Sequence, residues 1–272
     1  MRGRGFISKK MFYAAALVLL ILCLLALFAP LISPYRPNAQ GDLVRERLLP
    51  PSLAHPFGTD QFARDLFARV LYGGRISLFI SVSVVVISTV IGVLYGGISG
   101  YLGGWVDLAM MRFVDLLLAF PAVFLIIALV ALYGSNLLVL VLVLSFLGWM
   151  GMSRLVRSEV LRLRQQPFVL AEVALGLRPV TILVRHILPN LMPTVLAVAT
   201  IRVGVILLLE SALSFLGLGV QPPTASWGSI IQDGRDVLVQ GWWVSFFPGL
   251  MIVLSVFSFN LIGEYWRERI ES

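Results

Sequence analysis

Cysteine, histidine and lysine are almost absent from this sequence of 272 residues. Cys23 is the only cysteine, which excludes an internal disulfide and a cysteine-based metal cluster. The two histidines, His55 and His186, are far apart in the sequence, so a metal site with several imidazole ligands is not predicted. Lys9 and Lys10 are the only lysines and neither ends a glycine-rich segment, so the chain has no P-loop for ATP.

Charged side chains are also scarce, because they make up 13% of the residues against roughly 25% in soluble domains. Hydrophobic residues make up 59%, which excludes a disordered chain. The sequence is likewise too apolar for a nucleic-acid-binding domain, although its net charge is +7. No serine stands in a Gly-x-Ser-x-Gly context, and we predict no catalytic residue, no metal and no cofactor bound by this chain.

Uncharged stretches long enough to cross a bilayer recur along the chain, which excludes a soluble domain. The first stretch is too long for the core of a signal peptide and no small-x-small cleavage site follows it, so we expect it to be retained. We therefore predict an all-α polytopic membrane protein with six transmembrane helices. The predicted spans are 11–32, 76–98, 113–132, 137–152, 191–218 and 244–262.

The positions of lysine and arginine predict which face is the cytoplasm. Basic residues precede the first span, and six arginines lie between the fourth and fifth spans. With six spans both groups share one face, so we expect both termini in the cytoplasm. The 33–75 stretch also holds six arginines, offset by four acidic residues, and argues the other way. The predicted divisions are a cytoplasmic tail at 1–10, the first span at 11–32, an external loop at 33–75, a core at 76–267 that includes a cytoplasmic loop at 153–190, and a cytoplasmic tail at 268–272.

The long cytoplasmic loop contains the signals of two short helices joined by a sharp bend. Pro167 suits the first turn of a helix, and Gly176 suits the left-handed residue that ends one. A second helix is predicted from Pro179 to the residues before Pro189. Composition alone leaves two interpretations open, an amphipathic hairpin resting on anionic lipid and a docking helix for a cytoplasmic partner.

The same loop resembles a known family motif. Ala174-Leu-Gly176, thirteen positions before Pro189, resembles the EAA loop of importer-type ABC permeases. Further blocks resemble the second (C-type) permease subunit of dipeptide, oligopeptide and nickel importers, which are binding-protein-dependent. These blocks are Phe57-Gly-Thr-Asp60 with Arg64-Asp65, Gly103 to Pro121, Ser214 to Gly228, and Phe259-Asn-Leu-Ile-Gly263 with Arg267, so they extend over about residues 57–267 in order.

The resemblance implies a type I ABC importer permease fold in the cell inner (plasma) membrane. It implies a heterodimer with a second, similar permease, two cytoplasmic ABC ATPases that hydrolyse ATP, and an external substrate-binding protein. The substrate would be di- or oligopeptides, with nickel or another metal chelate as the alternative. A stand-alone channel or secondary transporter is the distant alternative, and a membrane-embedded hydrolase has no nucleophile–base pair to support it. The residues implied to couple the loop to an ATPase are Leu170, Ala171, Glu172, Ala174, Leu175, Gly176, Arg185, His186 and Pro189.

One position departs from the family pattern. The acidic residue of the motif usually stands six positions before the loop glycine, which is Leu170 here, and the acid appears at Glu172 instead. Two residues on a helix differ by about 200°, so Glu172 is expected nearly on the opposite face. The usual polar contact to the ATPase is therefore absent or is made from another direction.

Ionisable and small residues inside the spans are further candidates. Arg202 and Glu210 are eight residues apart, roughly 12 Å along a helix, so they cannot pair directly. Glu210, with Ser214 and Asn260, is a candidate for the translocation path or the subunit interface, and a structural inter-helix bond is the alternative; for Arg202 we favour a structural or snorkelling role. We also predict a helix-end ion pair between Arg112 and Asp115, and close helix packing at Gly92, Gly96 and Gly100.

Overall fold

Helices account for the architecture of residues 8–271, which are the residues that the computed structural model describes. No strand occurs within this range, and the basic residues predicted in the tail at Arg2 and Arg4 lie outside it. The elements are α1 (Lys9–Leu27), α2 (Ala29–Ile32), α3 (Leu66–Leu102), α4 (Gly104–Leu118), α5 (Ala122–Tyr133), α6 (Leu137–Arg164), α7 (Pro167–Ala174), α8 (Pro179–Ile182), the π-helical turn η1 (Leu183–Ile187), α9 (Leu188–Phe215), α10 (Trp227–Gly234), the 3-10 turn η2 (Arg235–Val237) and α11 (Trp243–Glu271).

Five of the described helices are long and apolar enough to cross a membrane, and a sixth crossing is made if α4 and α5 count as one bent span. These two helices meet at an angle of 77° across a short break. Pro121 causes the break, because its extended backbone caps α5 and it has no N–H to continue the ladder of α4. The all-α polytopic fold is confirmed, with the third predicted span broken rather than continuous.

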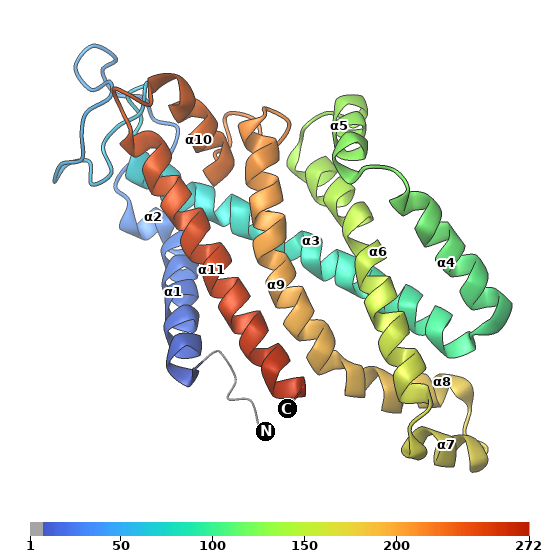
Figure 1. Cartoon of the computed structure of the whole chain (residues 1–272). Helices are drawn as coiled ribbons and strands as arrows, with labels where there is room; N and C mark the ends of the chain where they lie inside the picture. The colour runs from blue at the N-terminus through green and yellow to red at the C-terminus, as the bar shows by residue number, and fades with distance from the viewer. Residues whose placement is uncertain (1–7, 272) are drawn as a thin grey trace.

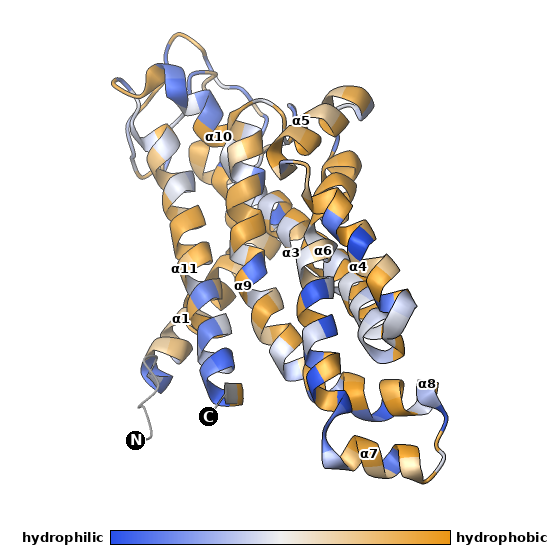
Figure 2. Ribbon diagram, turned by 45° about the vertical axis from the view of Figure 1, so that its right-hand side comes forward, coloured by the Kyte–Doolittle hydropathy of each residue, from blue (hydrophilic) through white to orange (hydrophobic). Residues whose placement is uncertain are grey.

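Both ends of the described chain lie on one side of the bundle, together with α7 and α8 (Figure 1). The 33–65 segment, α10 and α5 lie on the opposite side (Figure 1). Polar residues concentrate at these two ends, while the helices between them are mainly hydrophobic along their length (Figure 2). Both ends on one side is the arrangement expected for an even number of crossings, such as six.

Helix α3 crosses the bundle obliquely behind α6 and α9, and it packs most extensively on α6 (Figure 1). The three glycines predicted for close packing lie on this contact. A Cβ on Gly92 would lie 2.6 Å from Cβ of Met152, one on Gly100 would lie 2.9 Å from the carbonyl oxygen of Arg157, and one on Gly96 would meet the Ser153 carbonyl. The two backbones can therefore approach only because these positions have no side chain.

The second spanning helix begins ten residues earlier than predicted, so the predicted loop boundary at residue 75 falls inside α3. Asp65 caps this extension by accepting a hydrogen bond from the Ala68 N–H at 2.7 Å. Gly73 and Gly74 disfavour a helix locally, yet here they are helical because they pack against α10. A Cβ on Gly74 would lie 2.9 Å from the ring of Trp227, which the sequence pattern could not show.

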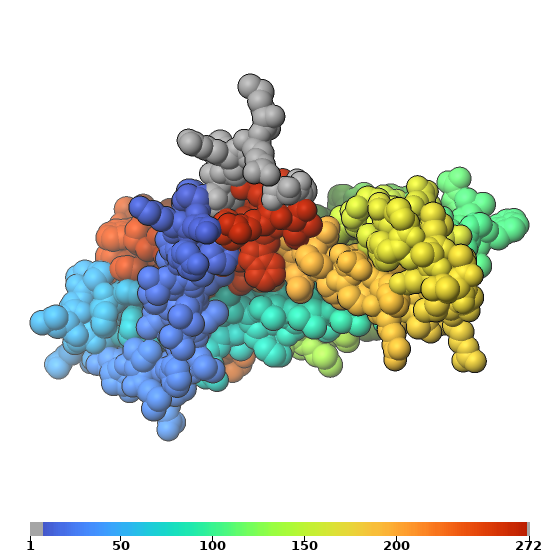
Figure 3. All heavy atoms as spheres, turned by 90° about the horizontal axis from the view of Figure 1, so that it is seen from below, coloured from blue at the N-terminus to red at the C-terminus, as the bar shows by residue number. Residues whose placement is uncertain are grey.

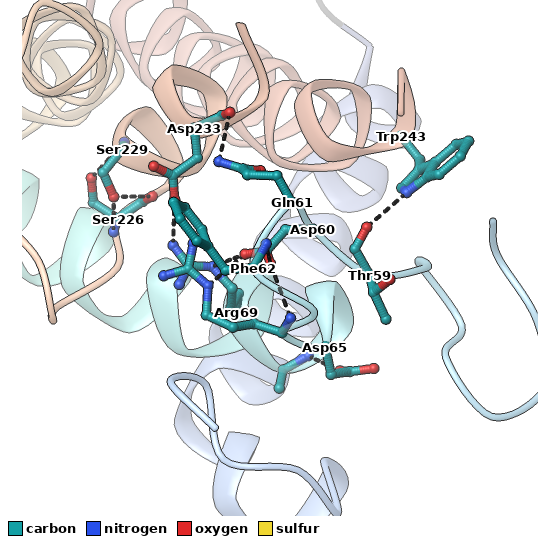
Figure 4. A network of polar contacts seen from close by, with 12 residues as sticks. Thr59, Asp60, Gln61, Phe62, Asp65, Arg69, Ser226, Ser229, Asp233 and Trp243 are labelled. Atoms are coloured by element: carbon teal, nitrogen blue, oxygen red, sulfur yellow. Dashed lines mark hydrogen bonds and ion pairs between the residues drawn. The ribbon is translucent and has the colours of Figure 1, made fainter. Parts of the chain in front are cut away.

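The 33–65 segment has little regular structure and is held to the bundle by an ion-pair network (Figure 4). Asp60 is fully buried, with the Arg64 Nε at 2.6 Å and the Arg69 Nε at 3.5 Å. Both guanidinium groups also contact Asp233 in α10, each at 2.9 Å. Trp243 adds a hydrogen bond from its indole N–H to the Thr59 carbonyl at 3.1 Å. The segment is thereby joined to α3, α10 and α11.

On the side of the termini, the fifth spanning helix is longer than predicted. It runs without a break from Pro179 to Phe215 through α8, η1 and α9, whereas the sequence predicted a stop before Pro189. The π-helical turn accompanies this difference: the N–H of Leu188 bonds to the carbonyl of Leu183, and the helix continues past Pro189 although proline has no N–H to donate. Helix α6 likewise continues to Arg164, so only its end belongs to the predicted 153–190 loop.

Candidate functional site

The bend that links α7 to α8 is built from three local signals in the sequence. Pro167 begins α7, Gly176 ends the turn that follows it, and Pro179 begins α8. Gly176 has a φ of +75°, and its N–H donates to the Val173 carbonyl at 3.0 Å. No atom lies within 4 Å of a Cβ added at Gly176, so glycine is required here by the backbone conformation and not by lack of space.

Helix α7 has apolar residues on two faces, of which one packs against the bundle and the other is exposed. Val169 is fully buried among residues of α6, α8 and η1. Leu170 is 56% exposed, Val173 55% and Leu175 78%. Ala171, Ala174 and Gly176 are exposed as well. We name the exposed set Leu170, Ala171, Val173, Ala174, Leu175 and Gly176 the α7 surface.

The α7 surface lies on the side of the termini and at one end of the molecule. Seen from that side, the atoms of the chain between α6 and α9 gather opposite α1 (Figure 3). The surface is apolar and solvent-facing at a position beyond the spanning part of α6. Exposed apolar patches are typical of interaction sites, so the α7 surface is a candidate for one.

Glu172 lies on the inner side of α7 and does not belong to this surface. Its Oε1 is 2.7 Å from Nδ1 of His186 in η1, and its side chain is 16% exposed. The angular offset predicted for Glu172 relative to Leu170 is therefore seen in the structure. This carboxylate connects α7 to η1 through Oε1, and its predicted role in coupling stays a prediction. Arg185 and Pro189, two other predicted coupling residues, are exposed.

Glu210 is enclosed by hydroxyl groups at the other end of α9. It is fully buried, with the Ser214 Oγ at 2.8 Å and the Ser77 Oγ of α3 at 3.1 Å. Ser77 also accepts a hydrogen bond from the Trp227 N–H at 3.1 Å. Ser214 accepts one from the N–H of Val220. The cluster joins α3, α9 and α10, as the structural alternative for Glu210 expects, and a role of Glu210 and Ser214 in the translocation path or subunit interface stays a prediction.

Asn260 and Arg202 lie elsewhere in the bundle. Asn260 is half-buried in α11, and no hydrogen bond of its side chain is found within residues 8–271. Arg202 donates from one terminal nitrogen to the carbonyl of Gly148 in α6. It lines a cavity of about 200 Å³. The cavity was not predicted, because it depends on four helices that are distant in the sequence.

Ion pairs connect α4 to α6 near the same end as α7. Arg157 binds Asp107 through two hydrogen bonds of 2.5 Å, and Arg154 contacts Asp115. The predicted pair of Arg112 and Asp115 is present at 3.9 Å, on the exposed side of α4. The inter-helix pairs could not be predicted, because they join residues about 40 to 50 positions apart.

Comparison with known proteins places these features in a family. Residues 88–272 match the model of the binding-protein-dependent transport system inner membrane component. Residues 3–51 match the model of the N-terminal transmembrane domain of oligopeptide transport permease C.

Curated relatives match over nearly the whole chain. The dipeptide transport system permease protein DppC of Bacillus subtilis is 39% identical over 97% of this chain and 82% of its own length. The oligopeptide transport system permease proteins OppC of Bacillus subtilis and Haemophilus influenzae are 38% and 36% identical, each over 98% of this chain and over 87% and 86% of their own lengths. The chain therefore belongs to the family of binding-protein-dependent transport system inner membrane components.

Proposed function

We propose that this chain is one of two permease subunits of an ATP-driven importer and that the two together form a path for di- and oligopeptides. The named relatives are permeases of dipeptide and oligopeptide transport systems. These names favour peptides over the alternative of a nickel or metal-chelate importer. Membership of the permease family likewise disfavours a stand-alone channel.

The α7 surface is the observation on which the coupling proposal rests. It is an exposed apolar patch held in place by a buried residue, Val169, and by the pair of Glu172 and His186. A cytoplasmic ATPase that covers this patch would remove its apolar side chains from water. The chain has no P-loop of its own, so the ATP is hydrolysed in the partner ATPases and this chain needs no cofactor.

The proposed orientation places the termini and the α7 surface in the cytoplasm and the 33–65 segment outside the inner membrane. An external binding protein would deliver the substrate to the outer side. Because α8 and α9 form one helix, a movement of the ATPase at α7 would be carried into the membrane as a rigid-body displacement.

Gentle purification of the tagged chain from native membranes tests the proposed assembly. We expect a second polytopic subunit and one or two P-loop ATPases to be recovered with it. Recovery of the chain alone, active after reconstitution without ATP, would contradict the proposal.

The substrate is tested with the purified complex and its binding protein in liposomes. We expect ATP-dependent uptake of labelled dipeptides or oligopeptides that excess nickel does not inhibit. Uptake of nickel without uptake of any peptide would support the metal-chelate alternative instead.

The α7 docking site is tested by Gly176→Pro, because proline cannot adopt the positive φ at this position. We expect the ATPases to be lost from the complex while the spans remain inserted. Gly134→Pro is the matched control, since Gly134 also has a positive φ and open space around its Cβ but lies in the α5–α6 turn at the other end of the bundle. Equal loss of ATPase with both variants would contradict a specific role for the bend.

Leu170→Glu restores the acid at the position where the family motif usually has one. Leu170 is exposed, so the change should not disturb folding. We expect ATPase association to be retained or strengthened, and a large loss of association would show that the docking geometry differs from that of the family.

A further inference from the structure

Arg202 is a cation inside the spanning part of α9. It stands between the apolar residues Ile201 and Val203, and about 12 Å along the helix from Glu210. A charge at such a position is costly unless it is paired, hydrated or bound to a ligand. No motif of the family resemblance includes this arginine, so its presence requires an explanation from the structure.

The described residues provide only a partial set of partners for Arg202. A guanidinium has five N–H donors, and the hydrogen bond found here goes to the Gly148 carbonyl. No carboxylate within residues 8–271 forms an ion pair with it, and Glu210 is already surrounded by hydroxyl groups. The positive charge therefore has no counter-charge within the described chain.

Arg202 is also one of the residues that line a cavity of about 200 Å³. Four helices line it, with Ser88 in α3, Ala122 in α5, Leu147 in α6 and Val205 in α9 among the lining residues. Apart from Arg202 and the Ser88 hydroxyl, the lining side chains are apolar or absent. Val205 is 54% exposed and Ala122 is exposed, so the cavity opens at the surface between α9 and α5.

This combination of size and chemistry suits one end of an elongated anionic ligand. The cavity is smaller than the roughly 300–1,000 Å³ of sites that enclose a small molecule. A planar carboxylate matches the fork of a guanidinium and binds it through two parallel hydrogen bonds. Every unmodified peptide has one carboxylate at its C-terminus whatever its side chains are, so a single arginine can serve many peptides.

We propose that Arg202 and its cavity bind the C-terminal carboxylate of the peptide during its passage through the permease. The inference rests on the proposed function, because it takes a peptide as the substrate. It adds a residue that recognises one chemical group of that substrate within the membrane.

The test compares import of trialanine and trialanine amide by the complete reconstituted complex with its binding protein. Both peptides are supplied at concentrations that give equal occupancy of the binding protein, and the ratio of their import rates is measured. The binding protein is the same for every variant, so a change in the ratio reports on the permease. We expect Arg202→Gln to lower the acid-to-amide ratio at least tenfold.

Two controls and a conservative variant accompany this measurement. Arg202→Lys keeps the charge without the fork and should give an intermediate ratio. Thr200→Ala removes a hydroxyl on the same helix that donates to the Leu196 carbonyl at 2.8 Å, and it should leave the ratio unchanged. Arg112→Gln removes an equal charge from a side chain that is 77% exposed and should also leave it unchanged.

A second measurement covers the case in which the binding protein rejects the amide. Arg202 is labelled with phenylglyoxal in the detergent-solubilised complex, and the label is located by mass spectrometry. Trialanine should protect Arg202 at least threefold more than trialanine amide does. Equal labelling in the two would overturn the proposal.

The remaining outcomes separate this inference from the proposed function. An unchanged ratio in Arg202→Gln, with normal import of both peptides, would overturn the role of Arg202 and leave the peptide permease intact. Loss of the second permease from the Arg202→Gln complex would show that a carboxylate of that subunit neutralises the arginine, which also overturns it. A wild-type complex that imports no peptide would overturn the proposed function and this inference together.

Discussion

The two regions at opposite ends of the bundle use arginine in different ways. In the 33–65 segment and the start of α3, Arg64 and Arg69 have side chains only 13% and 4% exposed and bind Asp60 and Asp233. In the 165–190 region, Arg178 and Arg185 are exposed, and no ion pair is found for either of them within the described chain. Apolar side chains do not separate the two regions, since Val44 of the 33–65 segment is 92% exposed and Leu175 of the α7 surface is 78% exposed.

The difference shows that a count of arginines does not reveal whether their side chains are buried or exposed. The neighbouring carboxylates decide this, because Asp60 and Asp233 form ion pairs with Arg64 and Arg69 inside the fold. The 33–75 stretch argued against the expected orientation by its number of arginines. Two of those arginines are occupied by buried ion pairs, which fits the proposed external position of the segment.

The largest expected effect comes from removing the buried carboxylate of the outer region. Asp60→Ala should destabilise the protein by about 3–5 kcal/mol, because it removes a fully buried carboxylate from Arg64 and Arg69 and leaves them only Asp233 to share. The melting temperature of the purified complex measures the loss of stability and should fall. The amount of ATPase bound per folded molecule should stay unchanged. Asp42→Ala is the control, since Asp42 is half-exposed and its pair with Arg45 is 3.9 Å long. Equal melting temperatures of Asp60→Ala and Asp42→Ala would show that the ion-pair network around Asp60 does not stabilise the protein.

At the other end, a change on the α7 surface should affect binding and not folding. Leu175→Glu places a charge on a side chain that is 78% exposed, so stability should change by less than about 0.5 kcal/mol. Association with the ATPases should fall at least tenfold, which is about 1.4 kcal/mol. Val44→Glu, at a side chain 92% exposed in the outer segment, is the matched control and should not affect association. Equal effects of the two would remove the distinction between the regions.

Breaking the ion pair between Glu172 and His186 should have an effect of intermediate size on transport. Each single alanine variant should reduce ATP-driven transport about twofold to fivefold by loosening α7, and the double variant should cost no more than either. A transport assay on all three variants completes the cycle. If Glu172→Ala alone were far more damaging than His186→Ala, Glu172 would contact the ATPase directly.

The smallest effect is expected from the unpaired arginines of the 165–190 region. Arg178→Gln combined with Arg185→Gln should weaken ATPase association about twofold at low salt, and the difference should disappear at high ionic strength. Association measured across a salt series checks this. A difference that persists at high salt would show a desolvated contact instead of a screened one.

Local signals in the sequence predicted the bend at α7 correctly. Pro167, Gly176 and Pro179 each restrict their own backbone, so their positions alone place the ends of α7 and the start of α8. The outward position of Leu170 relative to Glu172 also follows from helical geometry. The partner of Glu172 did not follow, because the π-helical turn that carries His186 has no signal in the sequence.

Features that depend on distant contacts were predicted less well. The start of α3 was placed too late, because Gly73 and Gly74 look like a loop until α10 is packed against them. The hydroxyl partner that Ser77 of α3 provides for Glu210 was not predicted, because the two residues are 133 positions apart. The cavity at Arg202 could not be predicted either, because its lining residues come from four helices that are distant in the sequence.

The unbroken helix from Pro179 to Phe215 has a mechanical consequence. Its 37 residues span about 55 Å, longer than the hydrocarbon core of a bilayer. One end lies beside the α7 surface and the other is fastened to α3 and α10 by the Glu210 cluster. Because the Phe215 end is fastened, a displacement of α7 would be taken up at the Pro179 end of this helix. The π-helical turn η1 and Pro193 lie near that end, and both interrupt the regular hydrogen bonding of an α-helix, so this is where we expect the helix to bend.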